Sequence, residues 1–164
     1  MKKYLFVLIA FSFLAGASCQ QKTDDKAERI ALADKYVKAW NEGNLSLLDE
    51  ILTPECVRHH VDISEDIIGI KAIKEYVTYM RTGFPDLNVT LDELIIAEDH
   101  SIGRWMITGT NTGPMGDSPP TGKKVKYSGI EVARIVDGKL VESWIYYNQA
   151  ALFIQLGYTI TPPE

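Results

Sequence analysis

The hydrophobic pattern of this chain changes its period once, at the segment Phe84-Pro85-Asp86-Leu87. Upstream of it, apolar residues recur every three to four positions, which is typical of amphipathic helices. This spacing predicts three helices and one short strand, the helices at about 25–41, 45–52 and 69–82 and the strand at 56–61. Downstream, apolar and polar residues alternate, which predicts four half-buried strands, at 88–97, 101–110, 124–136 and 139–147.

The turn between the last two strands, Asp137-Gly138, is a strong hairpin signal, and one more helical segment follows at 149–156. Helices followed by an antiparallel meander indicate the α+β class. A strongly curved antiparallel sheet wrapped around the N-terminal helices would form a cone. We expect an apolar pocket at the wide end of that cone, where a small ligand would bind.

The first 18 residues predict a secretory signal, because two lysines precede an apolar run at 4–14 and a group of small residues at 15–18. Cleavage after Ala17 is one route. The other is lipid modification of Cys19, which would become the first residue of the mature protein. We favour the second, because the polar stretch 19–26 is suited to a tether. The expected location is the bacterial cell envelope, with the membrane contacted only through the lipid.

Removal of residues 1–18 leaves 146 of the 164 residues, enough for one domain at 27–158 and a short tail at 159–164. It also removes two lysines, so the formal net charge changes from −5 to −7. That charge argues against nucleic acid as a partner. If Cys19 carries lipid, Cys56 has no intrachain partner, and disulfides do not stabilise this fold.

Several short segments occur in a characteristic order along residues 36–157. They are 40–45 (WNEGNL), 69–70 (GI) with Lys74, 84–87 (FPDL), 109–113 (GTNTG), 120–123 (PTGK), 134–144 (RIVDGKLVESW) and 155–157 (QLG). With them the chain resembles the SnoaL-like polyketide cyclase (ester cyclase) family of the nuclear transport factor 2-like superfamily. The resemblance implies a cone-shaped α+β barrel, often dimeric through the outer sheet face. It also implies cofactor-free ring closure by an intramolecular aldol reaction.

The chain departs from the family pattern at two positions. Family cyclases carry an aspartate, used as general acid and base, four residues after the tryptophan of the last strand. Here that position is Asn148, an amide that can donate and accept hydrogen bonds but cannot shuttle a proton. The histidine that often ends the family's Gly-Thr-His segment is replaced by Asn111. The cyclase chemistry therefore does not carry over intact.

Alternation along the last strand places Trp144, Tyr146 and Asn148 on one face, which the resemblance directs toward the pocket. These side chains would form an aromatic wall with polar tips around a ring-shaped ligand. The alternative is a core strand whose polar groups are satisfied internally. The other candidate ligand-binding residues are Trp40, Met106 and Asn111.

Two residues are candidates for the missing acid or base. Glu131 shares a face with Ala133 and Ile135, and desolvation in an apolar cone would raise its pKa toward a useful range. His59 could serve near neutral pH, although its neighbour His60 must point to the opposite face. The alternatives are a Glu131 that is exposed or paired with a basic residue, and a structural His59.

We expect neither a cofactor nor a metal, since Cys56, His59 and His60 lie too close together on one strand to converge on one ion. Three functions remain open. One is a cofactor-free cyclase, isomerase or hydrolase for a small hydrophobic carbonyl or ester compound. Another is an envelope lipoprotein that binds such a ligand without chemistry. The third is a domain that binds a partner through its outer sheet face.

Overall fold

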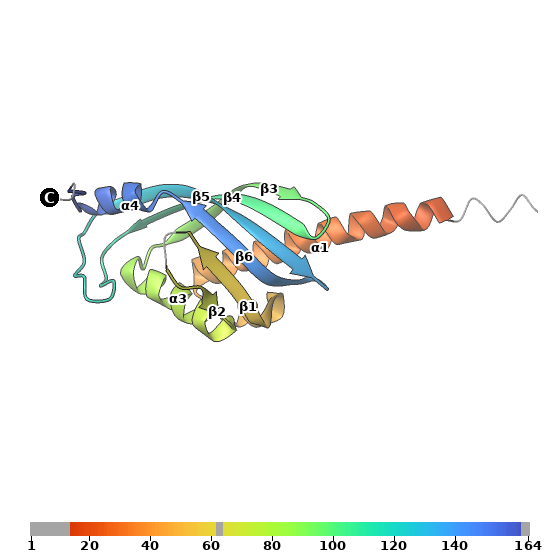
Figure 1. Ribbon diagram of the computed structural model, residues 1–164, viewed down its shortest axis with the longest axis horizontal. Coiled ribbons are helices and arrows are strands. Elements are labelled where there is room, and N and C mark those ends of the chain that lie inside the picture. The colour runs from red at the N-terminus through yellow and green to blue at the C-terminus, as the bar shows by residue number, and fades with distance from the viewer. Residues whose placement is uncertain (1–13, 62–63, 162–164) are drawn as a thin grey trace, which may run out of the picture.

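The computed structural model describes residues 14–61 and 64–161 and has an α+β fold, as predicted (Figure 1). Its elements in chain order are α1 (Leu14–Glu42), α2 (Ser46–Ile51), β1 (Leu52–His60), β2 (Ile67–Ile68), α3 (Ile70–Gly83), β3 (Asn88–Ile96), β4 (His100–Thr110), β5 (Lys124–Val136), β6 (Lys139–Tyr147) and α4 (Gln149–Leu156). The change of period near residue 85 is therefore the point where the helical half of the chain ends and the meander begins.

The described strands form one curved, unclosed sheet in the order β2-β1-β6-β5-β4-β3 (Figure 1). Strands β3 to β6 are the predicted antiparallel meander. Strand β1 extends it by pairing with β6 in parallel, which the sequence did not predict. The β5–β6 turn has positive φ angles at Asp137 (49°) and Gly138 (71°), as a tight hairpin turn requires.

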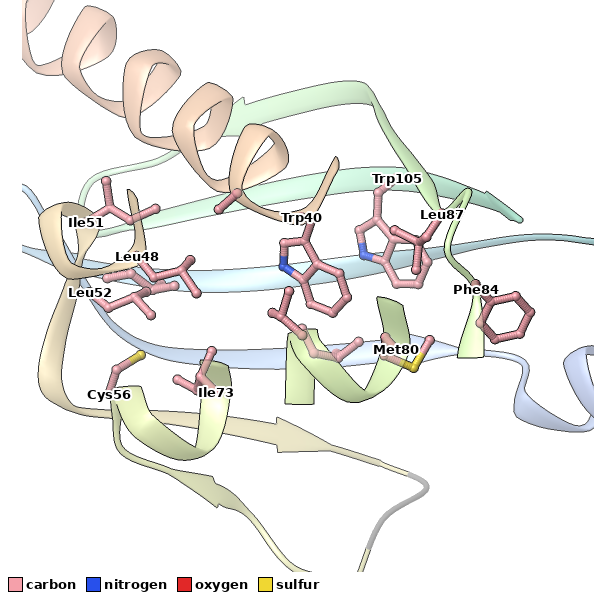
Figure 2. Packing of buried hydrophobic residues seen from close by; sticks show 14 of the residues in the cluster. Trp40, Leu48, Ile51, Leu52, Cys56, Ile73, Met80, Phe84, Leu87 and Trp105 are labelled. Atoms are coloured by element: carbon pink, nitrogen blue, oxygen red, sulfur yellow. The ribbon is translucent and has the colours of Figure 1, made fainter. Parts of the chain in front are cut away.

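Helices α1 and α3 lie against the sheet, and the core fills the space between them (Figures 1 and 2). In α3, Ile73, Val77 and Met80 recur at helical spacing and are all buried. In Figure 2, Ile73 and Met80 lie with Trp40 and Trp105 between the helices and the strands. This continuous apolar layer fixes both helices relative to the strands.

Helix α1 is also attached to the sheet by one amide side chain. The Asn41 side chain donates from Nδ2 to the Val89 carbonyl (2.9 Å) and accepts at Oδ1 from the Val89 amide (2.6 Å). This pair of bonds fixes the C-terminal end of α1 against β3. The residues of α1 that precede Asn41 are thereby held over the sheet.

The first helix begins earlier than predicted, at Leu14, so residues 19–26 continue α1. Its N-terminal part projects beyond the sheet (Figure 1). Residues 1–13 of the predicted signal and residues 162–164 of the tail lie outside the described ranges. None of the described helices is both long and apolar enough to cross a membrane.

Candidate functional site

A pocket lies between α1, α3 and the sheet. It has about 950 Å³ of space between atoms, a volume that includes the solvent at its open side. Its wall is mostly apolar, with aromatic rings from α1 (Trp40), α3 (Tyr76), β4 (Trp105) and β6 (Tyr147). This is the pocket expected for the fold, bounded by the helices and the curved sheet.

Strand β1 brings two polar side chains to this pocket. Arg58 and His60 line it, and His59 between them lies on the opposite face. Such alternation is required of a strand, and the parallel pairing with β6 sets Arg58 beside Ser143 and His60 beside Ile145. Both side chains are buried, with exposed fractions of 6% and 5%.

Arg58 is the centre of the polar group in the pocket. Its Nη1 atom forms an ion pair with Glu131 Oε1 at 3.3 Å and donates a hydrogen bond to the Tyr36 hydroxyl. Its Nε atom donates to His60 Nε2 at 3.0 Å. The guanidinium also lies over the Trp40 ring, 5.6 Å from its centroid. Side chains from α1, β1 and β5 are thus joined through one buried cation.

Burial shifts the acid–base properties of this group. Desolvation raises the pKa of the Glu131 carboxyl, partly offset by the Arg58 charge and the Ser143 hydroxyl. Desolvation and the Arg58 charge lower the pKa of His60 to about 3, so its ring is neutral at physiological pH. Desolvation also raises the pKa of Tyr36, which stays protonated.

These protonation states match what carbon-acid chemistry requires. Glu131 is a carboxylate whose basicity is increased by burial, so it can accept a proton from carbon. The Tyr36 O–H and the N–H of the neutral His60 ring can donate hydrogen bonds to a developing oxyanion without losing their own protons. Because the His60 Nε2 atom accepts from Arg58, the ring proton is on Nδ1.

Of the residues selected from the sequence, Trp40 and Glu131 line the pocket. Glu131 shares its inward face with Ala133 and Ile135, as predicted. The alternative of a paired glutamate also holds, because its side chain is only 14% exposed and contacts Arg58. A buried carboxylate beside a ligand site is consistent with either a structural or a chemical role.

The prediction that Trp144 and Tyr146 face the pocket is wrong. Ile145 and Tyr147 line it instead, and Tyr146 is 47% exposed on the other face. Trp144 stacks on His59 there, with ring centroids 5.3 Å apart and planes 18° from parallel. The orientation of β6 implied by the resemblance is therefore reversed, because the other alternating set of its residues faces the pocket.

The position of His59 is incompatible with direct action in the pocket. Its Nδ1 atom lies 2.7 Å from Asp66 Oδ1 and its Nε2 atom 3.0 Å from Glu142 Oε1, all outside the pocket. The hydrogen bond to Glu142 is the main cause that raises the pKa of His59. His60, its neighbour, is the histidine that the pleat turns inward.

Two further candidate residues also lie away from the pocket. On β4 the inward residues are Trp105 and Ile107, and the intervening Met106 points to the opposite face. Asn111 is buried with 3% exposure, and its amide donates to the Gly83 carbonyl at 3.1 Å and accepts from the Thr121 backbone N–H at 2.8 Å. Asn111 therefore holds the loop after β4 in place.

Asn148 is an exposed residue at the start of α4. Its Oδ1 atom accepts a hydrogen bond from the Ala151 backbone N–H at 2.9 Å, so it is the N-cap of that helix. It does not line the pocket. The strand ends at Tyr147, so the alternation that was extended to Asn148 no longer applies there.

Three pocket residues were not predicted as functional candidates from the sequence, namely Tyr36, Arg58 and His60. One signal was available for Tyr36, which precedes Trp40 by four residues and so shares its helix face. For Arg58 the signal was its place two residues before His60 in a short strand. In the described residues, no group of three His, Cys, Asp or Glu side chains could hold a metal ion.

Comparisons with known proteins agree with this architecture. The model of the family "SnoaL-like polyketide cyclase" matches residues 30–156. The aklanonic acid methyl ester cyclase DauD of Streptomyces sp. (strain C5) is 26% identical over 146 residues, which cover 83% of this chain and 86% of DauD. The corresponding cyclase DnrD of Streptomyces peucetius is 25% identical and is covered to 95%.

One solved structure with the same fold is described as "a putative hydroxylase". AclR from Streptomyces galilaeus is 30% identical with a TM-score of 0.71, covering 84% of this chain and 86% of AclR. A SnoaL-like protein from Jannaschia sp. CCS1 has a TM-score of 0.73 at 18% identity, which shows the shared fold. The residues matched by the family model, 30–156, include all of α3 and the part of α1 that lines the pocket from Leu32 onward.

Proposed function

The chain belongs to the SnoaL-like polyketide cyclase family, and we propose that it is a cofactor-free enzyme acting on a small hydrophobic carbonyl or ester compound. The proposed reaction is proton abstraction beside a carbonyl group, followed by intramolecular aldol ring closure. The observation that carries this proposal is Glu131, a carboxylate on the wall of an apolar pocket next to two neutral donors.

In the proposed mechanism, the Glu131 carboxylate takes the proton from the carbon beside the carbonyl group. The electron pair of that C–H bond moves onto the carbonyl oxygen and forms an enolate. The Tyr36 hydroxyl and the His60 N–H are the donors that stabilise this oxygen. The enolate carbon then attacks a second carbonyl carbon of the same molecule. The new alkoxide receives the proton held by Glu131, so no net proton is gained or lost.

This mechanism moves the base to a different strand from the one implied by the resemblance. The family aspartate position is Asn148, which caps α4 outside the pocket. Glu131 is on β5, where its register partner on β6 is Ile145. The proposal therefore keeps the family chemistry but assigns the proton transfer to a residue in the middle of the sheet.

The test is deuterium exchange at carbon. The protein would be incubated in D₂O with a panel of neutral and carboxylated α-tetralones, and label at C2 followed by NMR. We expect exchange above the buffer rate for the wild type and a fall of at least about 100-fold in Glu131→Gln. Glu142→Gln removes the same charge from the other side of the sheet and is the matched control, with wild-type exchange expected.

Because Glu131→Gln leaves Arg58 without its carboxylate, each exchange rate must be scaled to the folded fraction measured by near-ultraviolet circular dichroism. Glu131→Asp keeps the charge and provides a second, milder variant. Wild-type exchange in folded Glu131→Gln would reject the proposed base.

A ligand-binding protein without catalysis is the second candidate. The favouring observation is the Arg58–Glu131 ion pair, which satisfies the carboxylate in the absence of a substrate. Ligand binding detected by the fluorescence of Trp40 and Trp105, together with exchange at the buffer rate for the whole panel, would favour this function over the enzyme.

The proposal also includes export and attachment to the cell envelope through lipid on Cys19. Its support is the sequence of residues 1–26, with a basic start, an apolar run and small residues before the cysteine. Expression in a bacterium with an alkyne-labelled fatty acid would test it. Label is expected on the wild type and absent from Cys19→Ala, and an unlabelled wild type would reject the anchor.

A homodimer through the outer sheet face is the remaining part of the proposal. Ile130 and Tyr146 are register partners on β5 and β6, and they are 42% and 47% exposed on that face. A pair of neighbouring exposed apolar side chains is suited to burial against a second copy. Analytical ultracentrifugation should give a dimer for the wild type and a monomer for Tyr146→Glu, and a monomeric wild type would contradict it.

A further inference from the structure

The pocket has a second polar end, away from the group around Arg58. Arg29 of α1 and Ser101 of β4 both line the pocket. The Arg29 Nη1 and Ser101 Oγ atoms are buried and lack a hydrogen-bond partner among the residues that the structure describes. Ser101 is only 7% exposed, so its hydroxyl is almost entirely removed from bulk solvent. Buried polar groups without partners are rare and costly in native proteins.

The charge at this end is positive and uncompensated. Arg29 donates from Nη2 to the Glu98 backbone carbonyl, and within residues 14–61 and 64–161 it forms no ion pair. At the other end of the pocket, the charges of Arg58 and Glu131 offset each other, and His60 is neutral. The pocket therefore carries one formal positive charge that no described carboxylate offsets.

Two elements that bound the pocket set the spacing between its ends. Arg29 precedes Tyr36 by seven residues on the same face of α1, a rise of about 10 Å along the helix. On the sheet, Ser101 lies two residues before Gly103, the register partner of Glu131, a distance of about 7 Å along β4. Both estimates place the two polar ends about 7 to 10 Å apart, roughly the length of a bicyclic ring system.

We propose that Arg29 and Ser101 form a binding subsite for a carboxylate, so that the ligand is an apolar ring compound with an acidic group at one end. The guanidinium donates to one carboxylate oxygen through Nη1, and the Ser101 hydroxyl donates to the same group. The apolar walls between the two ends contact the rings. This inference rests on the proposed function only for the reacting carbonyl group, which would lie at the Glu131 end.

The test compares two ligands of the same shape, 2-naphthoate and 2-naphthamide, by quenching of Trp40 and Trp105 fluorescence. For the wild type we expect naphthoate to bind about tenfold more tightly, as a charge-assisted hydrogen bond would give. Arg29→Gln should remove this preference without changing the affinity for naphthamide. Arg29→Lys should retain part of it, and Ser101→Ala should weaken naphthoate binding about threefold.

Arg104→Gln removes a cation from the outer side of the sheet, where Arg104 pairs with Asp92, and should leave the preference unchanged. The subsite is contradicted if wild-type protein binds both ligands equally or binds neither, or if Arg29→Gln keeps the preference for naphthoate. Arg29 is partly exposed, so the variant should fold, and circular dichroism would verify this.

The assay measures binding and not turnover, so it separates this inference from the proposed function. A charge preference that depends on Arg29, found in a protein with no deuterium exchange, would reject the enzyme and keep the subsite. Deuterium exchange that depends on Glu131, with equal binding of the two naphthalenes, would keep the enzyme and reject the subsite.

Discussion

The two faces of the sheet carry similar sets of residues with opposite properties. The inner set is Arg58, His60 and Glu131, and the outer set is Arg134, His59 and Glu142. Each set has one histidine, one arginine and one glutamate; the inner set comes from β1 and β5, and the outer set from β1, β5 and β6. On the inner face, the pKa of the histidine falls and that of the glutamate rises. On the outer face both shifts have the opposite sign.

Burial explains the difference. Inside, desolvation is the largest cause of the shift in both His60 and Glu131, and it disfavours the charged form of each. Outside, the direct hydrogen bond between His59 and Glu142 is the largest cause for both residues, and it favours the charged forms. His59 and His60, adjacent in β1, thus acquire different chemistry because the pleat turns them to opposite faces.

The largest contrast should be in stability after loss of one glutamate. Glu131→Gln should lower the free energy of unfolding by about 3–5 kcal/mol, because Arg58 is left buried without its partner. Glu142→Gln should cost about 1 kcal/mol or less, because the Arg134 side chain is 36% exposed to water. Urea unfolding of both variants would measure this, and equal losses would contradict the contrast.

The pH dependence of stability should separate the two histidines. The folded-state pKa of His60 is about 3, below the value of about 6.5 when unfolded, so the unfolded chain binds the proton first. Stability from His60 is therefore present above pH 6.5 and falls by up to about 1.4 kcal/mol per pH unit as the pH drops below it. Urea unfolding at pH 4.5 to 8 should show a shallower acid-side loss in His60→Gln.

For His59 the sign is reversed. Its folded-state pKa is raised, so its contribution is complete below the unfolded pKa and is lost as the pH rises through the folded value. The effect should be about 1 kcal/mol or less because the side chain is partly exposed. If His59→Gln and His60→Gln changed the pH profile in the same direction, the assignment of opposite environments would be wrong.

Ligand binding should depend on Tyr147 and not on Tyr146. Tyr147 lines the pocket, whereas Tyr146 lies on the outer face. Tyr147→Leu should weaken naphthoate binding about threefold to tenfold through loss of aromatic contacts, and Tyr146→Leu should leave it unchanged. Fluorescence titration of the two variants tests this directly, and a larger effect at Tyr146 would restore the orientation expected from the sequence.

The smallest effect should come from the helix cap at Asn148. Asn148→Ala should cost about 1 kcal/mol of stability through loss of the bond to the Ala151 N–H, and Asn148→Asp should cost nothing, because aspartate is an equally good N-cap. Neither should alter deuterium exchange. A rise in exchange for Asn148→Asp would show that this position reaches the substrate after all.

The sequence predicted the local structure well because local structure depends on local pattern. The four strands of the meander, the Asp137-Gly138 turn and the helix at 70–83 were all predicted within a few residues. The inward face of Glu131 was also predicted, because Ala133 and Ile135 form an apolar face with it.

The orientation of β6 could not be predicted in the same way. Trp144 and Tyr146 on one face and Ile145 and Tyr147 on the other are equally apolar, so alternation defines two faces without identifying the inner one. The helices and the pairing with β1 decide it, and both are long-range contacts. The Arg58 group was missed for the same reason, since its members come from positions up to 95 residues apart, from Tyr36 to Glu131.

The pH dependence of deuterium exchange by the wild-type protein tests the central claim, that the chemistry belongs to the inner face. The base must be ionised, so the rate should rise with pH through a single step with a pKa above the ordinary range of a glutamate. That step should remain in His59→Gln and disappear in Glu131→Gln. A profile that follows the titration of His59 and is lost in His59→Gln would place the proton transfer on the outer face and contradict the account.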